Sequence, residues 1–264
     1  MIKAAFHVHS TYSDGEFTIA ELREKFLLAG CAVIGMADHA DAFDADKIRQ
    51  YVAECERLSD ERLLVMPGLE FGCVQRMHIV GYGVTALIDS SDPATVIAHI
   101  RAHRGVAVIA HPPGPLFEVI EHLEILPDGI EGWNSKYDGR YAPRPVTFEL
   151  IARLQVSQPG LRAFYGQDLH WRTQYAGLFI LLDVPTAERT MVLEALRGGA
   201  FEGSTAALRL PADGHLAADL IERFARINAR SQRFLTVVRS AKTMMGGAFA
   251  LLPAPLKAQL RRFF

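Results

Sequence analysis

Short apolar runs that end at or near a metal-binding type of residue recur along this chain of 264 residues. Residues 4–9, 33–37, 63–66, 106–110 and 163–166 form such runs, and segments with helical patterning separate most of them. This alternation predicts strands joined by helical crossovers, and therefore a mostly parallel sheet. About seven such units favour a closed, distorted barrel over an open sheet.

Nine residues in or near these runs have side chains that bind divalent metals through an imidazole nitrogen or a carboxylate oxygen. They are His7, His9, Asp14, His39, Glu70, His78, His111, Asp168 and His170. The two members of His7-x-His9 lie on one face of a strand because side chains alternate, and Asp168-x-His170 has the same spacing. The carboxyl ends of barrel strands meet at one rim. The sequence therefore predicts a multinuclear metal centre at that rim.

Each of these residues alone has an ordinary structural explanation. A lone histidine such as His78 is more often a hydrogen-bonded core residue, and Asp14 before a glycine is typical of a turn. Glu70 after an apolar run is compatible with a helix cap. All nine explanations would have to hold together, so the combination favours the metal centre. The remaining histidines that lack this placement are predicted to be surface or packing residues: His99, His103, His122 and His215.

The order of the motifs resembles that of the polymerase and histidinol phosphatase (PHP) family over about residues 3–205. The motifs are H-x-H-x-x-x-S-D-G, D-H, P-G-x-E, H-I-V-G, A-H-P and D-x-H. The resemblance implies an α/β fold, a distorted seven-stranded (β/α)7 TIM-like barrel, with two or three divalent ions (zinc, manganese or iron). It also implies a first metal on His7, His9, Glu70 and Asp168, a second on Glu70, His78 and His111, and a third on Asp14, His39 and His170.

The resemblance further implies a metal-dependent phosphoric ester hydrolase. Neighbouring divalent ions neutralise phosphoryl oxygens and lower the pKa of a bound water from 15.7 toward about 7, so hydroxide can attack phosphorus. We expect Glu70 to bridge two ions and Asp168 to orient the hydroxide. His39 or His170 is expected to assist protonation of the leaving group. The expected substrate is a small phosphomonoester or a nucleotide.

Three other functions stay open. A nuclease acting on short nucleic acid ends and a phosphotyrosine phosphatase would use the same kind of centre. A metal-binding scaffold without catalysis is the alternative outside the enzyme class. The complete ligand set argues against the scaffold, because a decayed site should lack some ligands.

Candidate substrate contacts follow two of the expected strands. Asn134, Lys136 and Arg140 come after the extended run that ends near residue 134, and Arg172 comes two positions after His170. Lysine and arginine at a rim suit phosphate oxygens. Asn134 is expected to support a ligand through a hydrogen bond. For Arg140 and the neighbouring Arg144, a solvated loop position is an equal alternative.

The composition is that of a globular enzyme, with 50% hydrophobic and 22% charged residues. We predict a metallophosphoesterase barrel over residues 1–205 and a basic, amphipathic helical extension over 206–264. Three cysteines without framework spacing favour a reducing compartment, and we expect the protein to be cytoplasmic. No apolar run reaches the roughly 18 residues of a spanning helix.

Charge is distributed unevenly along the chain. Residues 1–222 carry 19 basic and 30 acidic side chains, whereas residues 223–264 carry nine basic and none acidic. Apolar residues interleave with these cations, so the segment could lie on an anionic membrane surface, placing the protein at the inner membrane. A helix packed over the acidic body is the structural alternative. Binding to nucleic acid is a third interpretation and is less favoured by the apolar content.

Overall fold

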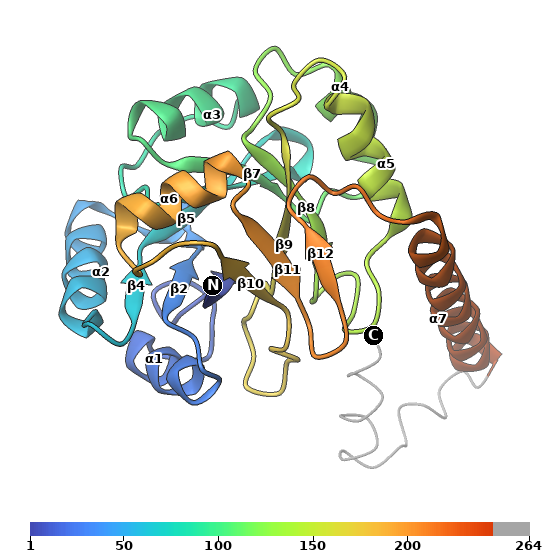
Figure 1. Ribbon diagram of the computed structural model, residues 1–264, viewed down its shortest axis with the longest axis horizontal. Coiled ribbons are helices and arrows are strands. Elements are labelled where there is room, and N and C mark those ends of the chain that lie inside the picture. Colours follow the sequence, from blue (N-terminus) through green and yellow to red (C-terminus); the bar gives the residue numbers. More distant parts are fainter. Residues whose placement is uncertain (245–264) are drawn as a thin grey trace. The chain divides into compact units, whose positions relative to one another are not determined.

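The computed structural model describes residues 1–244 (Figure 1). The chain divides into two compact units, Met1–Leu216 and Ala217–Phe264. Within the second unit, the described part is a single helix, α7 (Ala218–Met244). The remainder of the predicted basic extension, residues 245–264, lies outside the described residues. Among the described residues, no helix is both long enough and apolar enough to cross a bilayer.

The first unit contains two six-stranded sheets. The first has the order β12 (Arg209–Pro211), β11 (Phe201–Ser204), β10 (Phe179–Leu182), β1 (Ile2–Val8), β2 (Val33–Met36) and β4 (Leu64–Met66). The second has the order β3 (Asp38–His39), β5 (Gly68–Gly72), β6 (His78–Tyr82), β7 (Val106–Ala110), β8 (Gly129–Asn134) and β9 (Arg162–Gly166).

Strand directions differ from the expected mostly parallel arrangement. Pairing is parallel between β1 and β2, β2 and β4, β3 and β5, β7 and β8, and β8 and β9. It is antiparallel along β12, β11, β10 and β1, and between β6 and both of its neighbours. The link from β5 to β6, residues 73–77, contains only the short 3-10 turn Val74–Arg76. A crossover needs a dozen or more residues, so β5 and β6 form a hairpin instead.

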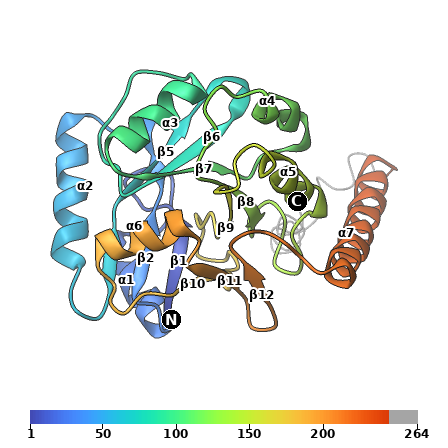
Figure 2. The same ribbon diagram turned by 45° about the horizontal axis from the view of Figure 1, so that its top comes forward.

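Helices lie outside the strands in both views (Figures 1 and 2). They are α1 (Ile19–Leu28), α2 (Ala45–Leu58), α3 (Pro93–Ala102), α4 (Phe117–Glu121), α5 (Pro145–Leu154) and α6 (Arg189–Gly198), with short 3-10 turns at Ala40–Ala42 and Gly114–Leu116. Side chains cap the first three of these helices. Thr18 and Glu21 form a capping box at the start of α1, and the side chains of Asp44 and Asp92 cap α2 and α3.

Two apolar layers hold the sheets in place. On the outer side of β1, β2 and β4, the side chains of α1 and α2 pack against Ala5, Val8 and Ile34. Between the sheets lies a chain of aromatic rings: Phe6 meets Tyr82 at 5.0 Å, Tyr82 meets Phe164 at 6.3 Å, and Phe164 meets Phe201 at 5.1 Å. Phe6 and Phe201 belong to the first sheet and Tyr82 and Phe164 to the second, so these contacts join the two sheets in a common core.

A bulge in β1 sets which side chains face this core. Phe6 pairs with Gly35 and Val8 with Met36, so His7 is an extra residue in the ladder. Its φ of 61° is left-handed. In a regular strand, Phe6 and His7 would point to opposite faces. The bulge turns both toward the second sheet, while Val8 packs with the outer layer.

The two sheets are connected beyond the ends of β1 and β9. Val8 and Leu169 form a parallel bridge, and the His9 amide donates to the Leu169 carbonyl at 3.0 Å. The α/β class of the prediction is therefore confirmed. Closure of the strands into a seven-stranded barrel stays a prediction.

Candidate metal centre

The nine predicted ligands come from both sheets and meet at one rim. They lie at the end of β1 and just beyond it (His7, His9), in the next loop (Asp14), at the end of β3 (His39), within β5 (Glu70), at the start of β6 (His78), and just after β7 (His111) and β9 (Asp168, His170). His78 begins its strand, yet it pairs with Gly72 and Ala110, the last residues of its neighbours. The antiparallel direction of β6 therefore brings it to the same rim.

Glu70 is buried at the centre of the cluster, and each of its oxygens faces its own set of imidazole nitrogens. Oε1 lies 3.0 Å from His78 Nδ1, 3.2 Å from His111 Nε2 and 3.5 Å from His7 Nε2. Oε2 lies 3.2 Å from His39 Nδ1 and 3.5 Å from His9 Nε2. A carboxylate surrounded on both oxygens in this way is suited to bridging two ions.

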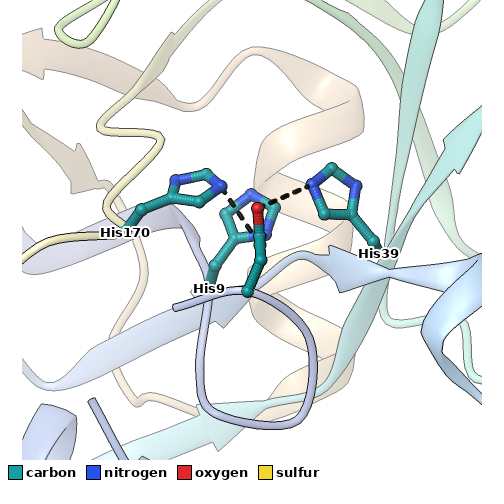
Figure 3. Close-up of side chains that lie close together, drawn as sticks. His9, His39 and His170 are labelled. Atoms are coloured by element: carbon teal, nitrogen blue, oxygen red, sulfur yellow. Dashed lines mark ion pairs between the residues drawn. The ribbon is translucent and has the colours of Figure 1, made fainter. Parts of the chain in front are cut away.

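Asp14 forms a second group on the more exposed side of the centre. Its carboxylate lies 3.3 Å from His170 Nε2, 3.5 Å from His9 Nδ1 and 3.6 Å from His39 Nε2. Figure 3 shows the rings of His9, His39 and His170 converging from three separate segments. The Asp14 side chain is 54% exposed, so this group faces solvent.

Asp168 is buried and belongs to the inner part of the cluster. Its Oδ1 lies 3.1 Å from His170 Nδ1, 3.6 Å from His9 Nε2 and 3.7 Å from His7 Nε2, and its Oδ2 lies 3.6 Å from His111 Nε2. Asp168 thus joins histidines of β1 and β7 to the segment after β9.

The donor atoms fit divalent ions. Four overlapping groups each offer ligand atoms within 4.8 Å of one another: His9, Asp14, His39 and His170; His7, His9 and Asp168; His7, Glu70 and His111; and His39, Glu70 and His78. Within the described residues, His7 Nε2 and both ring nitrogens of His9 are buried without a hydrogen-bond partner. Burying such atoms unsatisfied is costly, and coordination of a cation would satisfy them. The expected division into three metal positions stays a prediction.

Glu131 is a buried residue that hydrogen-bonds members of this cluster. The sequence analysis did not select it. Its Oε1 accepts a 2.7 Å hydrogen bond from His7 Nδ1, and its Oε2 accepts bonds from the His111 amide and from Asn134 Nδ2. The bond to Nδ1 leaves Nε2 of His7 directed at Glu70 and Asp168. A Cβ at Gly166 would overlap Glu131 Oε1, so glycine there makes room for the carboxylate. The available signal was an acidic residue inside an apolar strand.

Asp38 is the second buried acid that the sequence analysis did not select. It accepts hydrogen bonds from the Ser10 amide at 2.8 Å and from the Ser13 hydroxyl at 2.7 Å. Burial raises its pKa, although these hydrogen bonds act in the opposite direction. Asp38 therefore anchors the loop that presents Asp14.

Electrostatics keep the central carboxylates ionised. Burial acts to raise the pKa of Glu70, but the charge of His7 and hydrogen bonds from His111 and His78 hold it well below its usual value. Burial also acts to raise the pKa of Asp168, but the charge of His7, a hydrogen bond with His170 and the charges of His111 and His9 hold that pKa well below its usual value. For His9, burial dominates and lowers the pKa well below its usual value, which favours the neutral imidazole that binds metals.

His7 behaves in the opposite way. Burial acts to lower its pKa, yet the carboxylates of Glu131, Asp168 and Glu70 raise it well above the usual value. In the metal-free protein, a proton on His7 supplies positive charge next to these carboxylates. A bound cation would take over that role.

Three of the nine residues have left-handed backbone. The φ angles are 61° at His7, 32° at His111 and 50° at Asp168. Non-glycine residues seldom adopt this region, and each such residue costs about 1–3 kcal/mol. Tertiary contacts must maintain these angles, and they aim the three side chains into one cluster.

The predicted substrate contacts have different environments. Lys136 Nζ donates to Asp168 Oδ1 at 3.2 Å and to His170 Nδ1 at 3.3 Å, so it lies beside the cluster. Asn134 is buried and its amide contacts Glu131 and Asp168, which is a supporting position. Arg140 instead stacks on the Tyr141 ring at 4.5 Å. Arg172 pairs with Glu21 at 2.5 Å and lies over Phe17, and its role in substrate binding stays a prediction.

Aromatic side chains flank the centre on the side of Lys136. Tyr137 lies 4.5 Å from the ring of His111, and Trp171 lies 5.7 Å from the ring of His170. Partial burial, followed by the charges of Asp168 and Glu70, raises the pKa of Tyr137 to about 12, so its phenol is neutral at physiological pH.

A pocket of about 720 Å³ adjoins the centre at His39 and His78, which contribute to its wall. Phe43 and Phe71 also line it, with Asp41 and Asp89. Its described lining contains acidic and apolar side chains but no lysine or arginine. Lys136, which contacts Asp168 and His170, is not part of this lining.

Comparison with known sequences identifies the family. Residues 5–125 match the PHP domain, a segment that contains seven of the nine clustered residues, from His7 to His111. The chain contains a PHP domain over these residues. The remaining two, Asp168 and His170, lie after the matched segment but inside the same cluster.

A known protein is similar in sequence to part of the chain. The chain is 27% identical over 143 residues to the DNA polymerase/3'-5' exonuclease PolX of Bacillus subtilis (strain 168), which covers 44% of this chain and 24% of PolX. It therefore spans about a quarter of that relative's length.

Two solved structures share the fold of the PHP-domain protein. A two-domain protein of Bacteroides vulgatus ATCC 8482, containing a predicted PHP-like metal-dependent phosphoesterase, has a TM-score of 0.55 at 15% identity, covering 85% of this chain and 69% of that one. PsfC of Pseudomonas syringae PB-5123 has a TM-score of 0.51 at 12% identity. The match covers 89% of this chain and 98% of PsfC.

Proposed function

We propose that this PHP-domain protein is a metal-dependent phosphoesterase that hydrolyses a small phosphomonoester or a nucleotide. The observation that carries the proposal is the buried carboxylate of Glu70, faced on both oxygens by imidazole nitrogens, of which His7 Nε2 and His9 Nε2 have no hydrogen-bond partner among the described residues. Such a donor set suits two or three ions of zinc, manganese or iron.

Each proposed metal position uses donors that lie close together. His7, His9, Glu70 and Asp168 would hold the first ion, Glu70 with His78 and His111 the second, and Asp14 with His39 and His170 the third. Bound ions would neutralise phosphoryl oxygens and make hydroxide available near neutral pH. The net reaction adds water across the P–O bond and yields an alcohol and phosphate.

Side chains of the protein supply the remaining steps. The Lys136 ammonium lies 3.2 Å from Asp168 and can bind a phosphoryl oxygen that enters beside it. Asp168, kept ionised by its histidine neighbours, can accept a hydrogen bond that orients the attacking oxygen. His39 is 26% exposed and His170 only 3%, so His39 is the better placed of the two near an entering leaving group.

A nuclease is the second candidate. The similarity to PolX, whose name includes a 3'-5' exonuclease, favours it. In that case the substrate would be a phosphodiester at the end of a nucleic acid strand, and the same residues would act on it. A phosphotyrosine phosphatase and a non-catalytic scaffold remain further alternatives.

Turnover of p-nitrophenyl phosphate and of bis-p-nitrophenyl phosphate, with added manganese, tests these candidates. Faster hydrolysis of the monoester supports the phosphatase, and faster hydrolysis of the diester supports the nuclease. Glu70→Gln should lower kcat by more than the roughly 100-fold that loss of a supporting partner costs. The matched control is Glu118→Gln, an exposed glutamate of α4, which should behave as the unaltered chain. No turnover of either ester by metal-loaded protein would favour the scaffold.

A further inference from the structure

One side of the metal centre carries two exposed aromatic rings that the proposed chemistry does not use. Tyr137 is 59% exposed and Trp171 is 47% exposed, although each adjoins a histidine of the cluster. Large rings left in water beside a reactive centre lose the stabilisation that burial would provide. A ligand that covers them would recover that stabilisation.

The same ammonium group lies over both rings. Lys136 Nζ is 5.3 Å from the ring centre of Tyr137 and 5.3 Å from that of Trp171. It also reaches Asp168 at 3.2 Å. A phosphate bound at Lys136 and the centre would therefore have an aromatic surface directly beside it.

Both rings are held by well-bonded turns. The Tyr137 amide donates to Asn134 Oδ1 at 3.2 Å, in the turn that follows β8. The Trp171 carbonyl accepts a 3.0 Å bond from the Gln174 amide, and Gln174 Nε2 donates to the Asp168 carbonyl at 2.7 Å. These bonds tie each turn to a residue of the centre, so little ordering is needed when a ligand binds.

The position of Lys136 favours the aromatic side for an anionic ester. The pocket at His39 and His78 presents Asp41 and Asp89, which would repel a second phosphate or an acidic substituent. The aromatic flank presents Lys136. Rings stacked beside a cation are the arrangement that binds a flat ring carrying a phosphate.

We propose that Tyr137 and Trp171 form a stacking surface that selects phosphate esters bearing an aromatic ring, either a nucleobase or a phenyl group, over esters of aliphatic alcohols. This inference rests on the proposed function, because the phosphate must occupy the centre. It deepens that function by naming the class of the organic group.

Non-hydrolysable phosphonates test the surface without turnover. Phenylphosphonate and methylphosphonate differ in the ring, so calorimetric titration of each into the metal-loaded full chain isolates its contribution. We expect phenylphosphonate to bind roughly ten-fold more tightly, the scale of a ring stacked on aromatic side chains. A phosphonate analogue of adenosine 5'-phosphate distinguishes the sources: tighter binding than phenylphosphonate indicates a nucleotide, and equal binding indicates an aryl ester.

Variants assign the preference to these two rings. The double variant Tyr137→Leu, Trp171→Leu should lose the preference and retain its affinity for methylphosphonate, which also shows that the centre is intact. Tyr137→Phe, Trp171→Phe keeps both rings and should keep the preference. Tyr141→Leu, which removes a 62% exposed tyrosine of the same loop, is the matched control and should bind as the unaltered chain does.

Two results would overturn the proposal in distinguishable ways. Equal affinity for both phosphonates, or a ring preference that survives the double leucine variant, excludes the stacking surface and leaves the phosphoesterase proposal standing. If neither phosphonate binds the metal-loaded chain, the phosphate site itself is contradicted, and both proposals fall.

Discussion

His7 Nδ1 donates a 2.7 Å hydrogen bond to Glu131 Oε1, and both side chains are fully buried. His7 comes from the first sheet and Glu131 from the second, so this bond crosses the interior at the base of the metal centre. It fixes the ring so that Nε2 faces Glu70 and Asp168. A buried pair of this kind both joins the sheets and orients a ligand.

Replacing Glu131 with glutamine should therefore weaken metal binding by about 10- to 100-fold, the usual cost of losing an orienting partner. Glutamine keeps the shape of the side chain but removes the charge that favours the required tautomer and ring orientation of His7. Titration of manganese or zinc into the chelated protein measures the affinity. Glu118→Gln is the control, and equal affinities for the two variants would contradict an orienting role.

Removal of divalent ions should lower the thermal stability of the first unit. An ion at 100 times its Kd stabilises the folded state by about 2.7 kcal/mol, and each kcal/mol shifts Tm by roughly 2–4 °C in a chain of this size. We therefore expect Tm to fall by about 5–10 °C on chelation and to recover when manganese or zinc is restored. Calorimetric scans check this, and a Tm unaffected by chelation would argue against bound metal.

The three cysteines should react slowly in the folded protein. Burial raises the pKa of Cys31 to about 11 and that of Cys73 to about 12, and it raises the pKa of Cys55 further. The thiolate is the reactive form, so at pH 8 only about one thiol in a thousand, or fewer, is ionised. Ellman's reagent should label the three thiols rapidly only after unfolding. Rapid labelling of the native chain would contradict this prediction.

We propose that the basic segment 223–264 contacts an anionic membrane surface. Each basic residue near such a surface contributes about 1 kcal/mol, so nine give ample attraction at low salt. Vesicles containing phosphatidylserine should carry the full chain upward in a flotation gradient, whereas neutral vesicles and high salt should abolish this. A chain ending at Leu216 should remain at the bottom. If it floats equally, the segment is not the anchor; if neither floats, packing is the better interpretation.

The clustered residues could be predicted from the sequence because most of them lie at or near the end, or at the start, of a recognisable apolar run. The direction of β6 could not be predicted from its apolar content, because apolar content does not distinguish parallel from antiparallel pairing. The one signal for a hairpin was the short link of five residues between Gly72 and His78. The rule of alternation placed His7 and His9 on one face. It could not show which face, because that depends on the bulge.

Glu131 was missed for a different reason. Its role depends on a contact with His7 across 124 positions, and no local pattern encodes such a distance. Arg172 also has a contact that sequence order does not show, because the folded chain pairs it with Glu21, 151 positions away; its role as a phosphate contact stays a prediction. Sequence order indicates which residues can act, and tertiary pairing determines which of them are available.

The extra residue in β1 has a consequence for how such a chain can change over time. Phe6 and His7 both face inward because His7 is an extra residue between Phe6 and Val8, which pair with consecutive residues of β2. Shortening β1 by one residue would remove the bulge, and no register of the regular strand would then turn both Phe6 and the neighbouring histidine toward the second sheet. We expect insertions and deletions to accumulate in the loops around the helices, while the length of this one strand stays invariant among working descendants.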